Sequence, residues 1–111
     1  MSVTDRRFDE PDETMTFEHG HSDMVTFDGT RLTRNTFEPG WRWSRSVGPL
    51  VGTDRCQVHH IGYLLNGRLH VATDDGGEAE IVAGQAYEIQ PNHDGWVVGD
   101  DPVISVEFMS T

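Results

Sequence analysis

Short apolar segments separated by turns fill the second half of the chain, and this spacing limits the possible folds more than any other feature. The segments are VHHIGYLL (58–65), RLHVAT (68–73), EAEIV (78–82), AYEIQ (86–90), WVVG (96–99) and VISVEFM (103–109). They are rich in β-branched and aromatic residues, and glycine, asparagine and aspartate stand between them. Strands at such intervals are typical of an all-β sandwich or barrel. Because no long stretch repeats its apolar positions with the helical period, we expect no long helix.

Two dipeptides indicate tight turns between antiparallel strands. Asp28-Gly29 lies between two extended segments, and Asn66-Gly67 joins residues 58–65 to residues 68–73. Both pairs favour the turns with positive φ angles that connect neighbouring antiparallel strands. The sequence therefore predicts antiparallel pairing, with residues 58–73 as the clearest hairpin.

The beginning of the chain has a different composition. The first 15 residues are charged and nearly free of apolar side chains, which is typical of a flexible segment. We therefore expect residues 1–22 to form a polar leader and residues 23–111 to form one barrel domain. The chain's 111 residues suit a single compact domain.

The charge balance excludes several classes of partner. Aspartate and glutamate number 19 against 8 basic residues, all of them arginine, for a formal net charge of -11. Such a surface repels phosphates, so we expect neither nucleic acid nor membrane as a partner. The single cysteine and the lack of an apolar signal segment indicate a cytoplasmic protein. An acidic surface without lysine fits a salt-rich cytoplasm or a genome that encodes arginine in place of lysine.

Two stretches resemble the motifs of the cupin family, whose members are small jelly-roll barrels. LLNGRLHV (64–71) is similar to the end of the first motif, and AGQAYEIQPNHDGWVVGDDP (83–102) is similar to the second, with Gly84 and Pro91 in place. The resemblance covers about residues 24–110 and extends to short bacterial cupin-domain proteins without a well-defined activity. It implies a single antiparallel jelly-roll barrel.

The resemblance also implies where a metal site would lie, although the residues differ from the family pattern of three histidines and a glutamate. Counted back from Gly67, His60 stands at the glutamate position, Cys56 at the second histidine and Asp54 at the first. Counted from Pro91, His93 stands at a glycine position and Trp96 at the last histidine.

Cys56, His60 and His93 combine a thiolate with two imidazoles, a set that favours zinc, with iron, manganese or nickel as alternatives. On a straight strand, residues 56 and 60 would be roughly 13 Å apart, so a shared ion requires a bend, which the first cupin motif supplies. We predict a divalent metal site formed by Cys56, His60 and His93, with Asp54 or water as the fourth ligand. His59 faces the opposite side of the strand from His60 and is not expected to bind.

Three tryptophans indicate a second kind of site. Trp41 and Trp43 are two residues apart and would project together from a strand, while Trp96 would add a large apolar wall. With Arg42 beside them, they could line a barrel mouth that binds a small organic ligand. The alternative is that they plug the barrel end or cover a dimer face.

These features leave three functions open: a metal-binding cupin with or without catalytic activity, a metal-free barrel that binds or senses a small molecule, and a dimeric interaction module. A Cys56–His60 nucleophile lacks an identifiable orienting group, and no phosphate-binding or dinucleotide motif is present. Ile61, Tyr63 and Leu65 form an apolar outward face, which predicts a homodimer.

Overall fold

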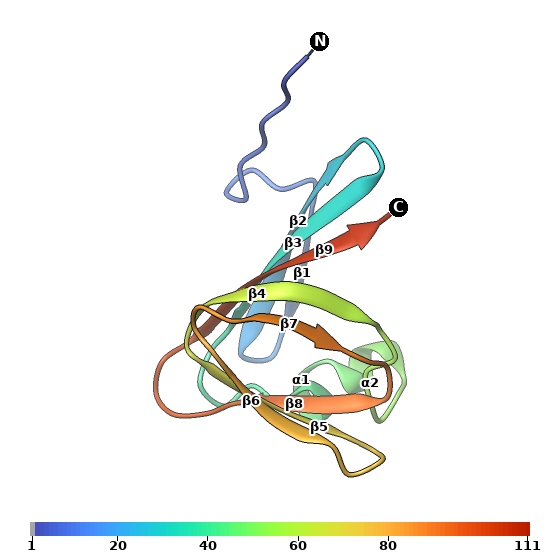
Figure 1. Ribbon diagram of the computed structural model, residues 1–111, viewed down its shortest axis with the longest axis vertical. Helices are drawn as coiled ribbons and strands as arrows, with labels where there is room; N and C mark the ends of the chain where they lie inside the picture. The colour runs from blue at the N-terminus through green and yellow to red at the C-terminus, as the bar shows by residue number, and fades with distance from the viewer. Residues whose placement is uncertain (1) are drawn as a thin grey trace.

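The computed structural model describes residues 2–111 and contains two antiparallel sheets (Figure 1). The larger sheet has the order β1-β2-β3-β9-β4-β7, and the smaller sheet has the order β6-β5-β8. The larger sheet consists of β1 (Glu13–Phe17), β2 (Gly20–Phe27), β3 (Thr30–Phe37), β4 (His60–Asn66), β7 (Ala86–Ile89) and β9 (Val103–Ser110). The smaller sheet consists of β5 (Arg68–Thr73), β6 (Glu78–Val82) and β8 (His93–Val97). This arrangement is the all-β jelly-roll that the sequence predicts.

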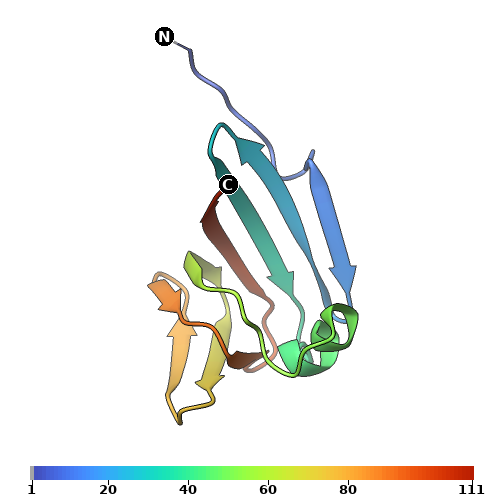
Figure 2. The same cartoon turned by 90° about the vertical axis from the view of Figure 1, so that its right-hand side faces the viewer.

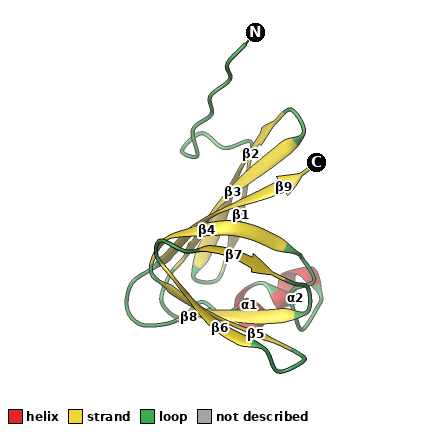
Figure 3. Cartoon of the chain, viewed as in Figure 1, coloured by secondary structure: helices red, strands yellow, loops and turns green. Residues whose placement is uncertain are grey.

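Two four-residue helices, α1 (Trp43–Ser46) and α2 (Gly48–Val51), lie between β3 and β4 at one end of the barrel (Figure 3). Pro49 suits the start of α2, where an N–H would have no partner, and Gly52 ends it with a φ of 80°. Trp43 begins α1, so the expectation that one strand carries Trp41 and Trp43 is wrong. Within residues 2–111, no helix has the length and apolar character that crossing a membrane requires.

The turn at Gly67 connects the two sheets instead of closing a hairpin. β4 pairs with β7 and β9, whereas β5 pairs with β6 and β8. The predicted hairpin at residues 58–73 is therefore wrong, while the hairpin at Asp28-Gly29 between β2 and β3 is confirmed. Gly67 has a φ of 85°, and a Cβ atom there would lie 2.4 Å from the carbonyl oxygen of Pro102. The crossing between the sheets thus requires glycine.

The larger sheet begins at Glu13, ten residues before the expected domain boundary at residue 23. β1 pairs with β2 along its whole length. Its apolar residues Met15 and Phe17 pack against the core, which explains why a segment of mostly polar composition forms a strand. The polar leader therefore ends before Glu13, and the prediction that it extends to residue 22 is wrong. Figure 2 shows the long strands of the larger sheet running past the smaller sheet toward both termini.

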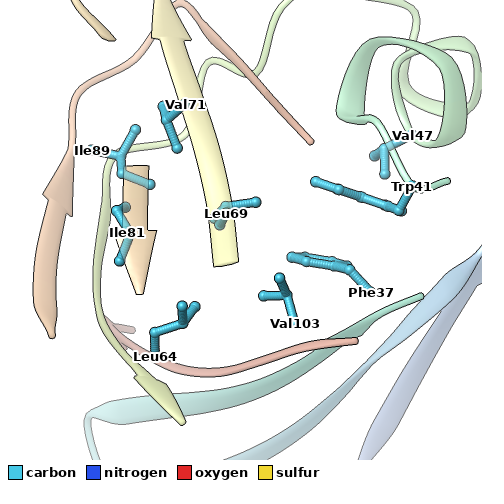
Figure 4. Packing of buried hydrophobic residues seen from close by; sticks show 9 residues of the cluster. All are labelled: Phe37, Trp41, Val47, Leu64, Leu69, Val71, Ile81, Ile89 and Val103. Atoms are coloured by element: carbon cyan, nitrogen blue, oxygen red, sulfur yellow. The ribbon is translucent and has the colours of Figure 1, made fainter. Parts of the chain in front are cut away.

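The apolar core fills the space between the two sheets (Figure 4). Its buried members are Phe37, Trp41, Val47, Leu64, Leu69, Val71, Ile81, Ile89 and Val103. The rings of Phe37 and Trp41 stack with their centroids 3.8 Å apart. Leu64 of β4 and Val103 of β9 are inaccessible to solvent, and these two strands pair with each other.

Candidate functional site

Cys56, His60 and His93 lie together inside the barrel. One ligand atom from each residue lies within 4.8 Å of the other two. Given zinc bond lengths of about 2.0–2.3 Å, the ligand atoms of one tetrahedral ion are about 3.3–3.8 Å apart. A small closing movement of the side chains would therefore suffice for a shared ion.

Backbone pairing places Cys56 beside His93. The Cys56 N–H donates to the His93 carbonyl at 2.8 Å, and the Asn92 N–H donates to the Cys56 carbonyl at 2.7 Å. This isolated bridge joins the segment before β4 to the first residue of β8. Residues 57–59 lie outside any strand, and Cys56 Sγ lies 3.4 Å from His60 Nε2, so the chain departs from a straight strand between these residues as predicted.

Glu107 of β9 fixes the orientation of the His60 ring. His60 Nδ1 lies 2.8 Å from Glu107 Oε1, and His60 Nε2 lies 3.4 Å from Cys56 Sγ. The Tyr87 hydroxyl donates to the other oxygen of Glu107 at 2.6 Å. When Nδ1 donates to a carboxylate, Nε2 is left for a ligand, and a carboxylate commonly orients metal-binding histidines in this way.

His93 is oriented in the same sense by the backbone. Its Nδ1 lies 2.7 Å from the Gln90 carbonyl oxygen. Since a carbonyl oxygen only accepts hydrogen bonds, Nδ1 carries the proton and Nε2 keeps its lone pair. The ring is buried and meets the His60 ring edge-on, with centroids 5.1 Å apart. Both imidazoles therefore use Nδ1 for a hydrogen bond to an acceptor and have Nε2 as the nitrogen that could bind an ion.

The charges in this cluster depend on one another. Burial favours the neutral thiol, but hydrogen bonds with His60 and His93 outweigh it and lower the pKa of Cys56. Burial likewise opposes the imidazolium, but the contacts with Cys56 and Glu107 raise the pKa of His60. The pKa of Glu107 is held below its usual value, because the contact with His60 outweighs burial. The site is thus built to stabilise a thiolate and a carboxylate on either side of one imidazole.

Gly62 leaves the space through which Tyr87 reaches Glu107. A Cβ atom at Gly62 would lie 2.7 Å from the Tyr87 hydroxyl and 2.8 Å from the Val106 carbonyl oxygen. Burial and the nearby Glu107 charge raise the pKa of Tyr87, so it remains a hydrogen-bond donor. No motif in the sequence indicates Glu107, Tyr87 or Gly62 in this role, because only the strand order brings them to His60.

Two residues near the cluster lie outside it. Asp54 is exposed in the loop before Cys56 and does not join the group of ligand atoms, so the prediction of Asp54 as fourth ligand is wrong. His59 is exposed and contacts Glu88, with Nε2 2.7 Å from Oε2. Its side chain thus lies away from the cluster, as the alternation of strand residues predicts.

A cavity of about 440 Å³ adjoins the cluster. Cys56, His60, His93 and Glu107 form one part of its wall, and Trp41 and Trp43 form another. Val51 and Val58 also line it and are about half exposed, so they mark its opening beside α2. Trp41 and Trp43 thus lie in the wall of a barrel cavity, and their binding of a ligand stays a prediction.

Trp96 and Arg42 lie on the other side of the barrel wall. His93 and Gly95 on β8 line the cavity. Because successive side chains on a strand point to opposite faces, the next residue, Trp96, points outward. The Arg42 guanidinium lies over the Trp96 ring, 4.3 Å from its centroid, and the His70 ring stacks on Trp96 with its centroid at 4.6 Å. Arg42 also donates to the buried Asp94 at 3.0 Å. The prediction that Trp96 and Arg42 line the cavity is wrong.

The fold is similar to that of solved cupin structures, although no family model and no curated protein matches the sequence. A cupin-like protein from Thermotoga maritima matches 83% of this chain and 68% of its own, with 19% identity and a TM-score of 0.61. A double-stranded β-helix protein from Klebsiella pneumoniae matches 95% of this chain and 82% of its own, with 14% identity and a TM-score of 0.63.

A further similar structure, an oxalate decarboxylase from Bacillus subtilis, matches 99% of this chain but only 30% of its own, with 11% identity and a TM-score of 0.68. At these identities the likeness concerns the fold alone. The chain therefore has the fold of the cupin superfamily.

Proposed function

We propose that this cupin-fold protein binds a divalent metal ion through Cys56 Sγ and the Nε2 atoms of His60 and His93. The main support is the orientation of the two rings, since each Nδ1 is held by an acceptor, which leaves Nε2 of each ring as the nitrogen that can reach an ion beside Cys56 Sγ. A thiolate and two imidazoles favour zinc, with iron, manganese or nickel as alternatives.

Three protein ligands leave a fourth position for water or a bound molecule, as in many catalytic zinc sites. The cavity beside the cluster gives a small molecule access to that position. A bound ion would supply Lewis-acid polarisation of an oxygen atom on such a molecule. Glu107 would act as a positioning residue, because it holds the His60 ring through Nδ1.

The alternative function is a metal-free barrel that binds or senses a small molecule. The contact that favours it is the distance of 3.4 Å between Cys56 Sγ and His60 Nε2. At that separation, the thiol and the imidazole already satisfy each other, and the site needs no ion to compensate its buried polar groups.

Elemental analysis of protein purified without a metal-affinity tag separates these functions. The metal site predicts close to one zinc or other divalent ion per chain. It also predicts that added zinc binds more weakly as the pH falls, because protons compete for the thiolate and the imidazoles. Protein that carries no ion, and that zinc, iron, manganese and nickel all fail to stabilise, would establish the metal-free barrel instead.

We also propose that the protein is cytoplasmic and forms a homodimer. Cys56 is a free thiol, which suits a reducing compartment. Ile61, Tyr63 and Leu65 on the outer face of β4 are each more than two-fifths exposed, which is unusual for three apolar residues in a row on one strand face.

A further inference from the structure

We infer that the barrel cavity takes a neutral, mainly apolar ring compound and rejects carboxylates and other anions. Within residues 2–111, no arginine lines this cavity, and the sequence contains no lysine. The polar part of the wall outside the metal-ligand cluster consists of uncharged groups and one carboxylate. These residues are Ser22, Asn35, Thr53, Gln57 and Glu107.

The imidazole of His60 in the cavity wall already has partners on both sides. His60 lies between two such partners, with Nε2 3.4 Å from Cys56 Sγ and Nδ1 2.8 Å from Glu107 Oε1. Without an ion, a charge on this imidazole is offset by the Cys56 and Glu107 groups on either side of it. With a divalent ion bound, the thiolate and the carboxylate again balance the two positive charges. In either state, the wall offers no net positive charge to an anion, and an unpaired buried charge costs several kcal/mol.

The remaining wall is aromatic and aliphatic. Phe17, Phe37, Trp41 and Trp43 contribute four rings, and Leu69, Val71 and Ile89 contribute branched apolar side chains. Aromatic walls favour flat rings, since stacked and edge-on contacts add to the gain from burial. The volume of about 440 Å³ falls within the range of small-molecule pockets and suits a compound of up to three rings.

Ser22 and Asn35 supply a place for one polar substituent. The Ser22 hydroxyl donates to Asn35 Oδ1 at 2.7 Å, and Asn35 Nδ2 donates to the buried Ser105 hydroxyl at 3.2 Å. These bonds hold the two side chains at the wall, and the Ser22 oxygen keeps lone pairs that can accept from a ligand. A neutral ring compound with a single hydroxyl or amine donor fits this wall.

This inference deepens the proposed function by naming the class of molecule for the same cavity, but it does not require the ion. Its test uses two fluorescent probes that differ only in a sulfonate group, N-phenyl-1-naphthylamine and 8-anilinonaphthalene-1-sulfonate. Both are titrated into the full chain, once without metal and once with zinc. The cavity has no arginine or lysine for the sulfonate, and Cys56 and Glu107 would offset the charge of a bound zinc ion. We therefore expect the neutral probe to bind at least about tenfold more tightly in both states.

Two pairs of variants locate the binding and test its cause. Trp43→Ala should weaken binding of the neutral probe several-fold, whereas Trp96→Ala, on the outer side of the wall, should leave it unchanged. Met15→Arg adds a cation to the cavity wall and should bring the affinity of the sulfonate probe up to that of the neutral one. Thr14→Arg adds the same charge to the neighbouring exposed position and should not.

Equal or tighter binding of the sulfonate by the wild-type protein would overturn the inference, and so would failure to bind either probe. Equal losses in Trp43→Ala and Trp96→Ala would place the probe outside the barrel and also overturn it. Since the wild-type comparison needs no variant, a failure of Met15→Arg to fold leaves the result decisive. Probe discrimination without zinc uptake would refute the metal site alone.

Discussion

Two adjacent histidines make nearly the same contact in different surroundings. His59 Nε2 lies 2.7 Å from Glu88 Oε2, and His60 Nδ1 lies 2.8 Å from Glu107 Oε1. The side chains of the first pair are 47% and 55% exposed, and those of the second are 20% and 18% exposed. Water screens the exposed pair, whereas a buried group that loses its partner becomes costly. Burial, and not contact distance, decides which of the two histidines the fold depends on.

Removing the carboxylates should separate the two pairs most clearly. Glu107→Ala leaves both His60 Nδ1 and the Tyr87 hydroxyl without a partner, so we expect the free energy of unfolding to fall by about 3 kcal/mol. Glu88→Ala should lower it by less than about 1 kcal/mol. Urea denaturation of both variants at neutral pH measures the difference. Equal losses would mean that the inner pair is screened as well as the outer one.

Zinc should distinguish the two histidines by nearly as much. At 100 times its dissociation constant, an ion that binds only the folded state stabilises it by about 2.7 kcal/mol. His60→Ala should abolish most of this stabilisation, and His59→Ala should retain it, although both changes delete the same atoms. Thermal unfolding with and without zinc gives the comparison. A similar loss in both variants would contradict the proposed ligand set.

Filling the space over Gly62 should disturb the inner pair without touching either histidine. In Gly62→Ala, the new methyl group overlaps the Tyr87 hydroxyl and the Val106 carbonyl, and we expect a loss of about 2 kcal/mol from overpacking. Tyr87→Phe is the matched control, because it deletes only the hydroxyl and should cost about 1 kcal/mol. Denaturation curves that place Gly62→Ala at or above the stability of Tyr87→Phe would show that Tyr87 does not need this space.

A change on the outer face of β4 should have the smallest effect on the inner site. Tyr63→Glu places a charge in the exposed apolar face and should convert the proposed homodimer into a monomer. The zinc-dependent shift in melting temperature should stay as in the wild type, since Tyr63 points away from the cavity. Light scattering at micromolar concentration reports the mass. A wild-type protein that is already monomeric would refute the dimer.

The strands were predictable from the sequence because their signal is local. The segments at 78–82, 86–90 and 103–109 alternate or concentrate apolar residues between turns, and all three form strands at nearly those bounds. The same local signal led to the wrong prediction of a hairpin at Asn66-Gly67. Local residues specify the turn, but the pairing partners of the strands on either side depend on the whole sheet. From the sequence alone, a turn between two sheets therefore cannot be told apart from a hairpin turn.

The candidate site was predictable in part, for reasons that differ between residues. The grouping of Cys56, His60 and His93 followed from the register of the resembling motifs. Trp96 was misplaced because it stands at the last histidine position of the resembling motif, whereas on β8 the residues His93 and Gly95 face the cavity and Trp96 faces outward. Glu107 could not be found from the sequence, because it is 47 residues from His60 and gains its role only through the pairing of β4 with β9.

The isolated bridge between Cys56 and His93 has a consequence for how the barrel opens. The same two residues that would hold the ion also carry the backbone hydrogen bonds that link the segment before β4 to β8. Local separation of the sheets at this end must therefore break the metal bonds together with the bridge. In the zinc-bound protein, the Cys56 amide should exchange its hydrogen with deuterium far more slowly than in the metal-free protein. Release of a molecule from the cavity through this end would be slowed in the same proportion.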